Sequence, residues 1–138
     1  ADEIAKRGGK PVSLDELLQK ADMITMHLPL TSESRGMLNA DTFAKMKKGV
    51  YIICAARGGV IDEAALLDAI NSGKVAGAGL DVFSSEPPGL TDLVANAKVV
   101  VTPHVGAQTI EAQERAANDI AEEIIAALDD KPLRWKVA

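Results

Sequence analysis

Three sets of polar residues in this sequence stand at the ends of apolar runs, and their types suit acid–base chemistry on a carboxylic acid. Arg57 follows the first run, Asp81 and Glu86 stand at the end of the second, and His104 follows the third. A guanidinium can hold a carboxylate through two parallel hydrogen bonds, and an imidazole can give or take a proton near neutral pH. A neighbouring carboxylate orients the imidazole and favours its charged form. These groups suit oxidation of a 2-hydroxy acid or reduction of a 2-keto acid, with the hydride carried by a cofactor.

Arg57 is the best defined of these residues, because of the stretch around it. The run Val50–Cys54 has no polar alternation, which predicts a strand buried on both faces, as in a parallel sheet. Ala55 and Ala56 are small and leave space close to the backbone, and Asp62 is a candidate N-cap for a following helix. Arg57 therefore lies where a strand ends and a helix begins, the edge at which open α/β sheets bind ligands.

Each of these residues, taken alone, also has a plain structural explanation. Arg57 could be an exposed loop arginine, and Glu86 a solvated carboxylate. His104 could cap the last helical region, and Asp81 could pair with a backbone amide. What favours a shared site is that all of them fall at the ends of predicted neighbouring strands.

Two further residues are candidates for a lesser role. His27 ends an earlier strand at the same edge, but the apolar segment Leu28-Pro29-Leu30 follows it. We interpret His27 as structural or as part of a cofactor pocket, and not as the proton donor. Cys54 is expected to be a small buried residue, since no neighbouring base would activate its thiol.

The elements that must position these residues alternate along the chain. Strands are expected at 21–28, 50–55, 75–83 and 98–102. Helices are expected at 1–6, from the capping-box pattern at Ser13 and Glu16 to Lys20, and at 39–48, 62–72 and 110–128. This order predicts an α/β fold with a doubly wound parallel sheet and helices on both faces. Right-handed crossovers would then place the carboxyl ends of all the strands at one edge.

Composition narrows the class of protein. The 138 residues suffice for one domain with a hydrophobic core. The 15 basic and 20 acidic residues give a net charge of −5, which argues against a nucleic-acid surface. No apolar run approaches the roughly 20 residues that cross a membrane. The single cysteine excludes an internal disulfide and fits a reducing, cytoplasmic compartment, and no cysteine–histidine cluster has zinc-site spacing.

Four segments together resemble the NAD-dependent D-2-hydroxyacid dehydrogenase family. They are CAARGGVIDEAAL, GKVAGAGLDVFSSEPP, VVVTPHVGAQT and, as the loop beside the adenine and ribose, MHLPLTSESRGMLN. The resemblance implies NAD as cofactor and a small 2-hydroxy or 2-keto acid as substrate. It favours 3-phosphoglycerate, the substrate of the first step of serine synthesis, and a homodimer or higher homo-oligomer. A glyoxylate or hydroxypyruvate reductase and a non-catalytic, NAD(H)-sensing corepressor are the alternatives.

The same resemblance implies a role for each candidate residue. Arg57 would bind the carboxylate and carbonyl of the substrate, His104 would be the acid/base, and Glu86 would hydrogen-bond the ring of His104. Asp81 would meet the nicotinamide carboxamide. The remaining residues implied in cofactor binding are Leu28 and Pro29 along the adenosine half, and Ala55, Ala56, Arg57, His104 and Gly106 around the nicotinamide.

One departure from the family is large. The glycine-rich phosphate loop and the acidic residue about 20 positions beyond it have no counterpart, because no strand precedes Gly8-Gly9. We therefore expect residues 1–138 to be the later part of a Rossmann-type NAD-binding domain, without its glycine-rich loop or a substrate domain. This segment alone should be inactive. The strand at 21–28 should then form an exposed edge that promotes association.

Overall fold

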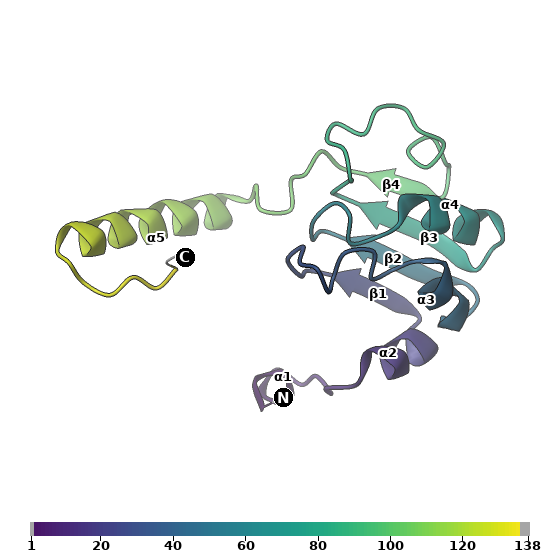
Figure 1. The fold of residues 1–138 in the computed structure, drawn as a ribbon, viewed down its shortest axis with the longest axis horizontal. Helices are drawn as coiled ribbons and strands as arrows, with labels where there is room; N and C mark the ends of the chain where they lie inside the picture. Colours follow the sequence, from purple (N-terminus) through teal and green to yellow (C-terminus); the bar gives the residue numbers. More distant parts are fainter. Residues whose placement is uncertain (1, 136–138) are drawn as a thin grey trace. The chain divides into compact units, whose positions relative to one another are not determined.

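The computed structural model describes residues 2–135, which form two compact units, one ending at His104 and one beginning at Val105. The helices are α1 (Asp2–Lys6), α2 (Leu14–Lys20), α3 (Ala40–Lys45), α4 (Glu63–Asn71) and α5 (Ile110–Leu128) (Figure 1). The strands are β1 (Met23–Met26), β2 (Val50–Cys54), β3 (Val75–Leu80) and β4 (Val99–Val101).

The four strands form one parallel sheet in the order β1-β2-β3-β4. Ile52 in the middle of β2 lies opposite Ile24 on one side and Ala78 on the other. The predicted parallel α/β fold is therefore confirmed, and the carboxyl ends of the strands meet at one edge. Each observed strand falls within its predicted range but is shorter, and β3 ends at Leu80, opposite the last residues of its neighbours β2 and β4.

The helix starts follow from capping side chains. The Asn39 side chain accepts hydrogen bonds from the backbone N–H groups of Asp41 and Thr42. In return, the Thr42 hydroxyl accepts a hydrogen bond from the backbone N–H of Asn39. At α2 the Glu16 carboxylate binds Lys20 at 3.0 Å, so within the described chain only the Ser13 half of the expected capping box forms. The helix predicted to run to Lys48 ends at Lys45, because the next residue is extended and buries its side chain in the core.

The hydrophobic core lies on one face of the sheet within residues 2–104. Leu18 of α2, Phe43 of α3 and Leu66 of α4 all join the core cluster that contains the inward residues of β1, β2 and β3. The prediction that Val50–Cys54 is buried on both faces is wrong, since Tyr51 is 50% exposed and alternate residues are buried. Within residues 2–104, the helices that contribute to the core lie on one face of the sheet. The sequence predicted helices on both faces.

The second unit begins at Val105 and contains α5. Thr109 caps the helix by accepting a hydrogen bond from the N–H of Ala112 at 3.1 Å. The predicted apolar side of this helix carries Ile120, Ile124 and Leu128, all of which are exposed. The backbone N–H of Arg134 donates to the Glu123 carboxylate, which brings the chain after the helix back along it. None of the described helices has the length and apolar character needed to cross a membrane.

The edge strand β1 leads to a prediction about the 138-residue chain made by itself. Met23, 59% exposed, lies at this edge, and the open sheet face continues through Tyr51 to Val100. We expect reversible self-association, because an unpaired edge and an apolar face both gain from burial. Sedimentation velocity over a concentration series measures it, and Met23→Lys should weaken it while Leu90→Lys, in a loop outside the sheet, should not. A folded monomer at every concentration contradicts this prediction.

Candidate functional site

His104 and Glu86 form a directly hydrogen-bonded pair at the carboxyl edge of the sheet. His104 Nδ1 lies 2.7 Å from Glu86 Oε2. The other carboxylate oxygen, Oε1, accepts a hydrogen bond from the backbone N–H of Phe83 at 3.1 Å. Glu86 is thus fixed at both oxygens in the loop after β3, while His104 stands just beyond β4 with a φ of 57°, a backbone conformation that is uncommon for a residue with a side chain.

These contacts favour the ionised form of Glu86 and determine the hydrogen-bond role of His104 Nδ1. The hydrogen bond to His104, followed by that from the Phe83 N–H, lowers the pKa of Glu86 below its ordinary value of 4.5. An ionised carboxylate can only accept hydrogen bonds, so Nδ1 of His104 is the donor in this pair. The second ring nitrogen, Nε2, is therefore the atom left to take up or release a proton.

Asp81 links the ends of β3 and β4. Its side chain is buried and accepts a hydrogen bond from the hydroxyl of Thr102. Its backbone N–H donates to the Cys54 carbonyl at 2.9 Å, which continues the ladder between β2 and β3. Asp81 therefore fixes the chain two residues before His104. A cavity of about 200 Å³ opens here, lined by Asp81, Phe83, Glu86, Pro87, Pro88, Thr102, Pro103 and His104.

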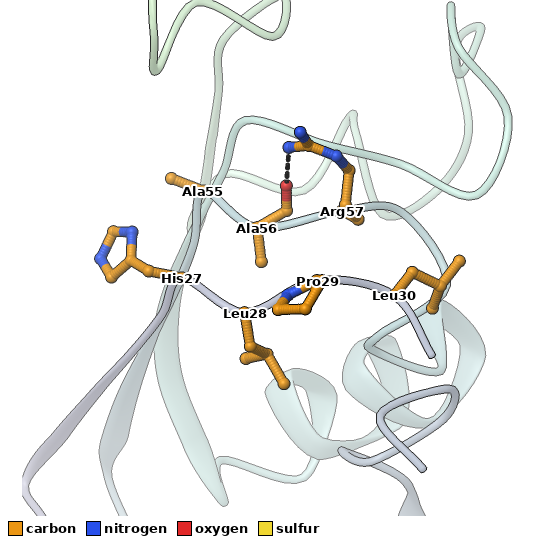
Figure 2. Close-up of a pocket in the computed structure, with 7 residues that line it drawn as sticks. All are labelled: His27, Leu28, Pro29, Leu30, Ala55, Ala56 and Arg57. Atoms are coloured by element: carbon orange, nitrogen blue, oxygen red, sulfur yellow. Dashed lines mark hydrogen bonds between the residues drawn. The ribbon is translucent and has the colours of Figure 1, made fainter. Parts of the chain in front are cut away.

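Arg57 lines a second and larger cavity at the same edge. This cleft of about 450 Å³ lies between the loops His27–Leu30 and Ala55–Arg57 (Figure 2). The guanidinium folds back and donates to the Ala56 carbonyl at 2.7 Å. Among the described residues, no carboxylate lies within salt-bridge distance of it. Its positive charge is therefore available to an anionic ligand.

The loop after β1 and the loop after β2, whose first residues form this cleft, are held together further along by backbone contacts. Gly36 N–H donates to the Gly59 carbonyl at 2.9 Å, and Leu38 pairs with Ile61 in an isolated parallel bridge. The buried hydroxyl of Ser34 donates to the Pro29 carbonyl at 2.7 Å. The backbone around Arg57 is consequently held in place, although the Arg57 side chain itself is exposed.

Not all of the predicted site residues share one cavity. Arg57 lines the larger cleft and His104 the smaller one. The backbone next to Arg57 contacts the backbone at Phe83, which lines the smaller cavity. Gly58, next to Arg57, packs so tightly on the Phe83 carbonyl that a Cβ there would overlap the oxygen. Gly106 belongs to the second compact unit and is not placed relative to these cavities.

The two lesser candidates, His27 and Cys54, lie in different surroundings. His27 lines the larger cleft, but its ring bonds the Thr25 hydroxyl at 2.7 Å and points away from Arg57 (Figure 2). Cys54 is buried, and this burial raises the pKa of its thiol, as expected of an inert cysteine. Sequence reasoning missed Thr102 as the partner of Asp81, although its position directly before Pro103-His104 was an available signal.

Comparison with known proteins gives one family. The model described as the D-isomer specific 2-hydroxyacid dehydrogenase NAD binding domain matches residues 1–106. The D-3-phosphoglycerate dehydrogenase of Mycobacterium tuberculosis is 53% identical over 124 residues, which are 90% of this chain and 24% of that protein. The protein of the same name from Bacillus subtilis is 52% identical over 125 residues, again 90% of this chain and 24% of that protein.

The fold is similar to solved members of the same group. A crystal structure of a D-lactate dehydrogenase from Treponema pallidum matches with a TM-score of 0.87 and 37% identity, covering 97% of this chain and 45% of that one. The chain therefore belongs to the D-isomer specific 2-hydroxyacid dehydrogenase family and matches its NAD-binding domain. The predicted family, fold class and NAD-binding character are confirmed. The chain spans 24% of the length of the two curated relatives.

The contact between Glu86 and His104 predicts how the carboxylate titrates. Because that hydrogen bond is the main cause of the lowered pKa of Glu86, His104→Ala should return it toward 4.5. Carbon-13 NMR of the glutamate side-chain carboxyls measures the shift. Because the pKa of Glu86 is lower in the folded than in the unfolded protein, the ionised carboxylate stabilises the fold at pH values above its unfolded pKa. This contribution is lost as the pH falls below 4.5 and through the folded pKa. A Glu86 pKa that His104→Ala leaves unchanged contradicts the assignment.

Proposed function

We propose that the protein carrying this chain transfers a hydride between a nicotinamide cofactor and a small 2-hydroxy acid, with 3-phosphoglycerate as the substrate. The observation that supports this most is the hydrogen bond of 2.7 Å between His104 and Glu86, formed at the same sheet edge as Arg57, which makes no salt bridge within the described chain. The choice of 3-phosphoglycerate rests on the 53% identity to the M. tuberculosis protein. Residues 1–138 would form the later part of the NAD-binding domain.

The larger cleft fits part of a nicotinamide dinucleotide. Leu28, Pro29 and Leu30 give it an apolar wall, and Ala55 and Ala56 let a flat ring approach the backbone. Leu28 and Pro29 would lie along the adenosine half, and Ala55 and Ala56 beside the nicotinamide. When bound, this cofactor supplies the hydride acceptor or donor that no side chain can provide. Asp81 and Gly106 remain proposed cofactor contacts.

Three residues of the chain would bind the substrate, transfer the proton and orient the imidazole. Arg57 leaves the Ala56 carbonyl and holds the substrate carboxylate through its fork of N–H groups. His104 Nε2 accepts the proton of the substrate hydroxyl during oxidation and returns it to the carbonyl oxygen during reduction. Glu86 keeps the ring oriented through Nδ1 and stabilises the imidazolium that forms. In this scheme Arg57, Glu86 and His104 are the catalytic residues.

The assembly and the location of the protein are also proposals. A homodimer or higher homo-oligomer is supported by the apolar side chains of α5 that are exposed in the single chain. A cytoplasmic location is supported by the one buried free cysteine and by the class of substrate.

Replacing the proton carrier should separate catalysis from binding. We expect His104→Ala to lower kcat at least about a hundredfold, because the smaller cavity then has no imidazole to transfer the proton. Binding of NAD should persist, since the larger cleft is unaltered. Steady-state kinetics in the full protein measure kcat, and calorimetric titration with NAD measures binding. Near-normal turnover with 3-phosphoglycerate and a panel of 2-hydroxy acids would exclude His104 as the acid/base.

Replacing the guanidinium should affect the substrate more than the cofactor. Arg57→Lys keeps the charge but removes the two-pronged hydrogen bond, so we expect KM for the acid to rise about tenfold and kcat to fall. KM for NAD should change little. Arg115→Lys on the exposed face of α5 is the matched control and should behave like the wild type. Unchanged kinetics for Arg57→Lys would assign Arg57 a surface role.

A further inference from the structure

Glu63 connects the loop that carries Arg57 with the loop that carries Glu86. It is the first residue of α4, six positions after Arg57, and its side chain is partly buried. Its Oε1 accepts a hydrogen bond from the backbone N–H of Ser84 at 2.6 Å. Ser84 stands two residues before Glu86. The Glu63 carboxylate therefore links the start of α4, which follows β2, to the backbone of the loop after β3.

The peptide group between Phe83 and Ser84 is held at both of its polar atoms. Its N–H is bound by Glu63, and its carbonyl oxygen packs directly on Gly58. A peptide unit is planar, so contacts at both ends fix its orientation. The N–H of Phe83, one peptide earlier, is the donor that holds Glu86 Oε1. A rotation of the 83–84 peptide would therefore disturb the contact that orients Glu86.

Helix capping alone does not account for this arrangement. An acidic residue in the first turn of a helix interacts favourably with the helix dipole wherever its side chain points. Asp62, the preceding residue, already caps α4 by accepting from the Ala65 N–H at 3.1 Å. The Glu63 carboxylate is instead directed at a backbone group of the adjacent loop.

We propose that Glu63 is a positioning residue, which sets the Glu86–His104 pair at a fixed place relative to Arg57. The inference rests on the proposed function, in which Arg57 and His104 must act on the same substrate molecule. A displacement of about 1 Å at such groups can lower the catalytic rate about a hundredfold. Glu63 contributes no contact to substrate or cofactor and acts only through the peptide that it holds.

The test compares Glu63→Ala, Glu63→Gln and Asp41→Ala in the full protein. Glu63→Ala should lower kcat/KM for the hydroxy acid about tenfold and leave KM for NAD unchanged. Glu63→Gln retains an oxygen acceptor and should restore most of the activity. Asp41→Ala removes an acidic first-turn residue from α3 and controls for the helix-dipole effect.

Two results would overturn the proposal. One is a Glu63→Ala enzyme with the wild-type kcat/KM, whatever its stability. The other is a Glu63→Gln enzyme as impaired as Glu63→Ala. Carbon-13 NMR of the carboxyl of Glu86 gives a readout without turnover: its pKa should rise toward 4.5 in Glu63→Ala only. If the wild type turns over no hydroxy acid, the proposed function fails, and this NMR comparison alone decides the role of Glu63.

Discussion

The parallel pairing of β2, β3 and β4 is the constraint on which the candidate site depends. Because the strands run in one direction, the loops that follow them all emerge at the same edge. Two backbone hydrogen bonds extend the pairing past the strand ends, from Asp81 N–H to the Cys54 carbonyl and from Thr102 N–H to the Leu80 carbonyl. The loops therefore begin from fixed positions, and side chains distant in sequence reach neighbouring places at this edge.

The site combines a rigid backbone with exposed reactive groups. The Phe83–Ser84 peptide is held by Gly58 and Glu63, and the loop after β1 is paired to the loop after β2. By contrast, the side chains of Glu86 and His104 are 37% and 44% exposed, and Arg57 rests on a carbonyl that a carboxylate ligand can replace. An exposed ion pair gains little in stability. The Glu86–His104 pair is thus better explained by the orientation it gives the imidazole than by a contribution to folding.

The sequence was informative where a local pattern determines the structure. β-Branched runs and the capping residues Ser13 and Asp62 predicted elements of the fold, and polar residues after strand ends predicted the contact between Glu86 and His104. Patterns are less informative about what covers a strand. The apolar run of β2 suggested burial on both faces, but its outer face meets no helix within residues 2–104. The contacts of Gly58 with Phe83 and of Glu63 with Ser84 join residues more than 20 positions apart in the sequence, and no sequence motif reports them.

The measurement that tests the central claim most directly is a crystal structure of the full protein with NADH and oxamate, an unreactive analogue of a 2-keto acid. The claim is that the loops after β2, β3 and β4 deliver a guanidinium, a carboxylate and an imidazole to one ligand. The expected structure has the oxamate carboxylate on the Arg57 fork and its carbonyl oxygen within hydrogen-bond distance of His104 Nε2, with Glu86 still on Nδ1. An oxamate bound away from the imidazole, with Arg57 still on the Ala56 carbonyl, would contradict it.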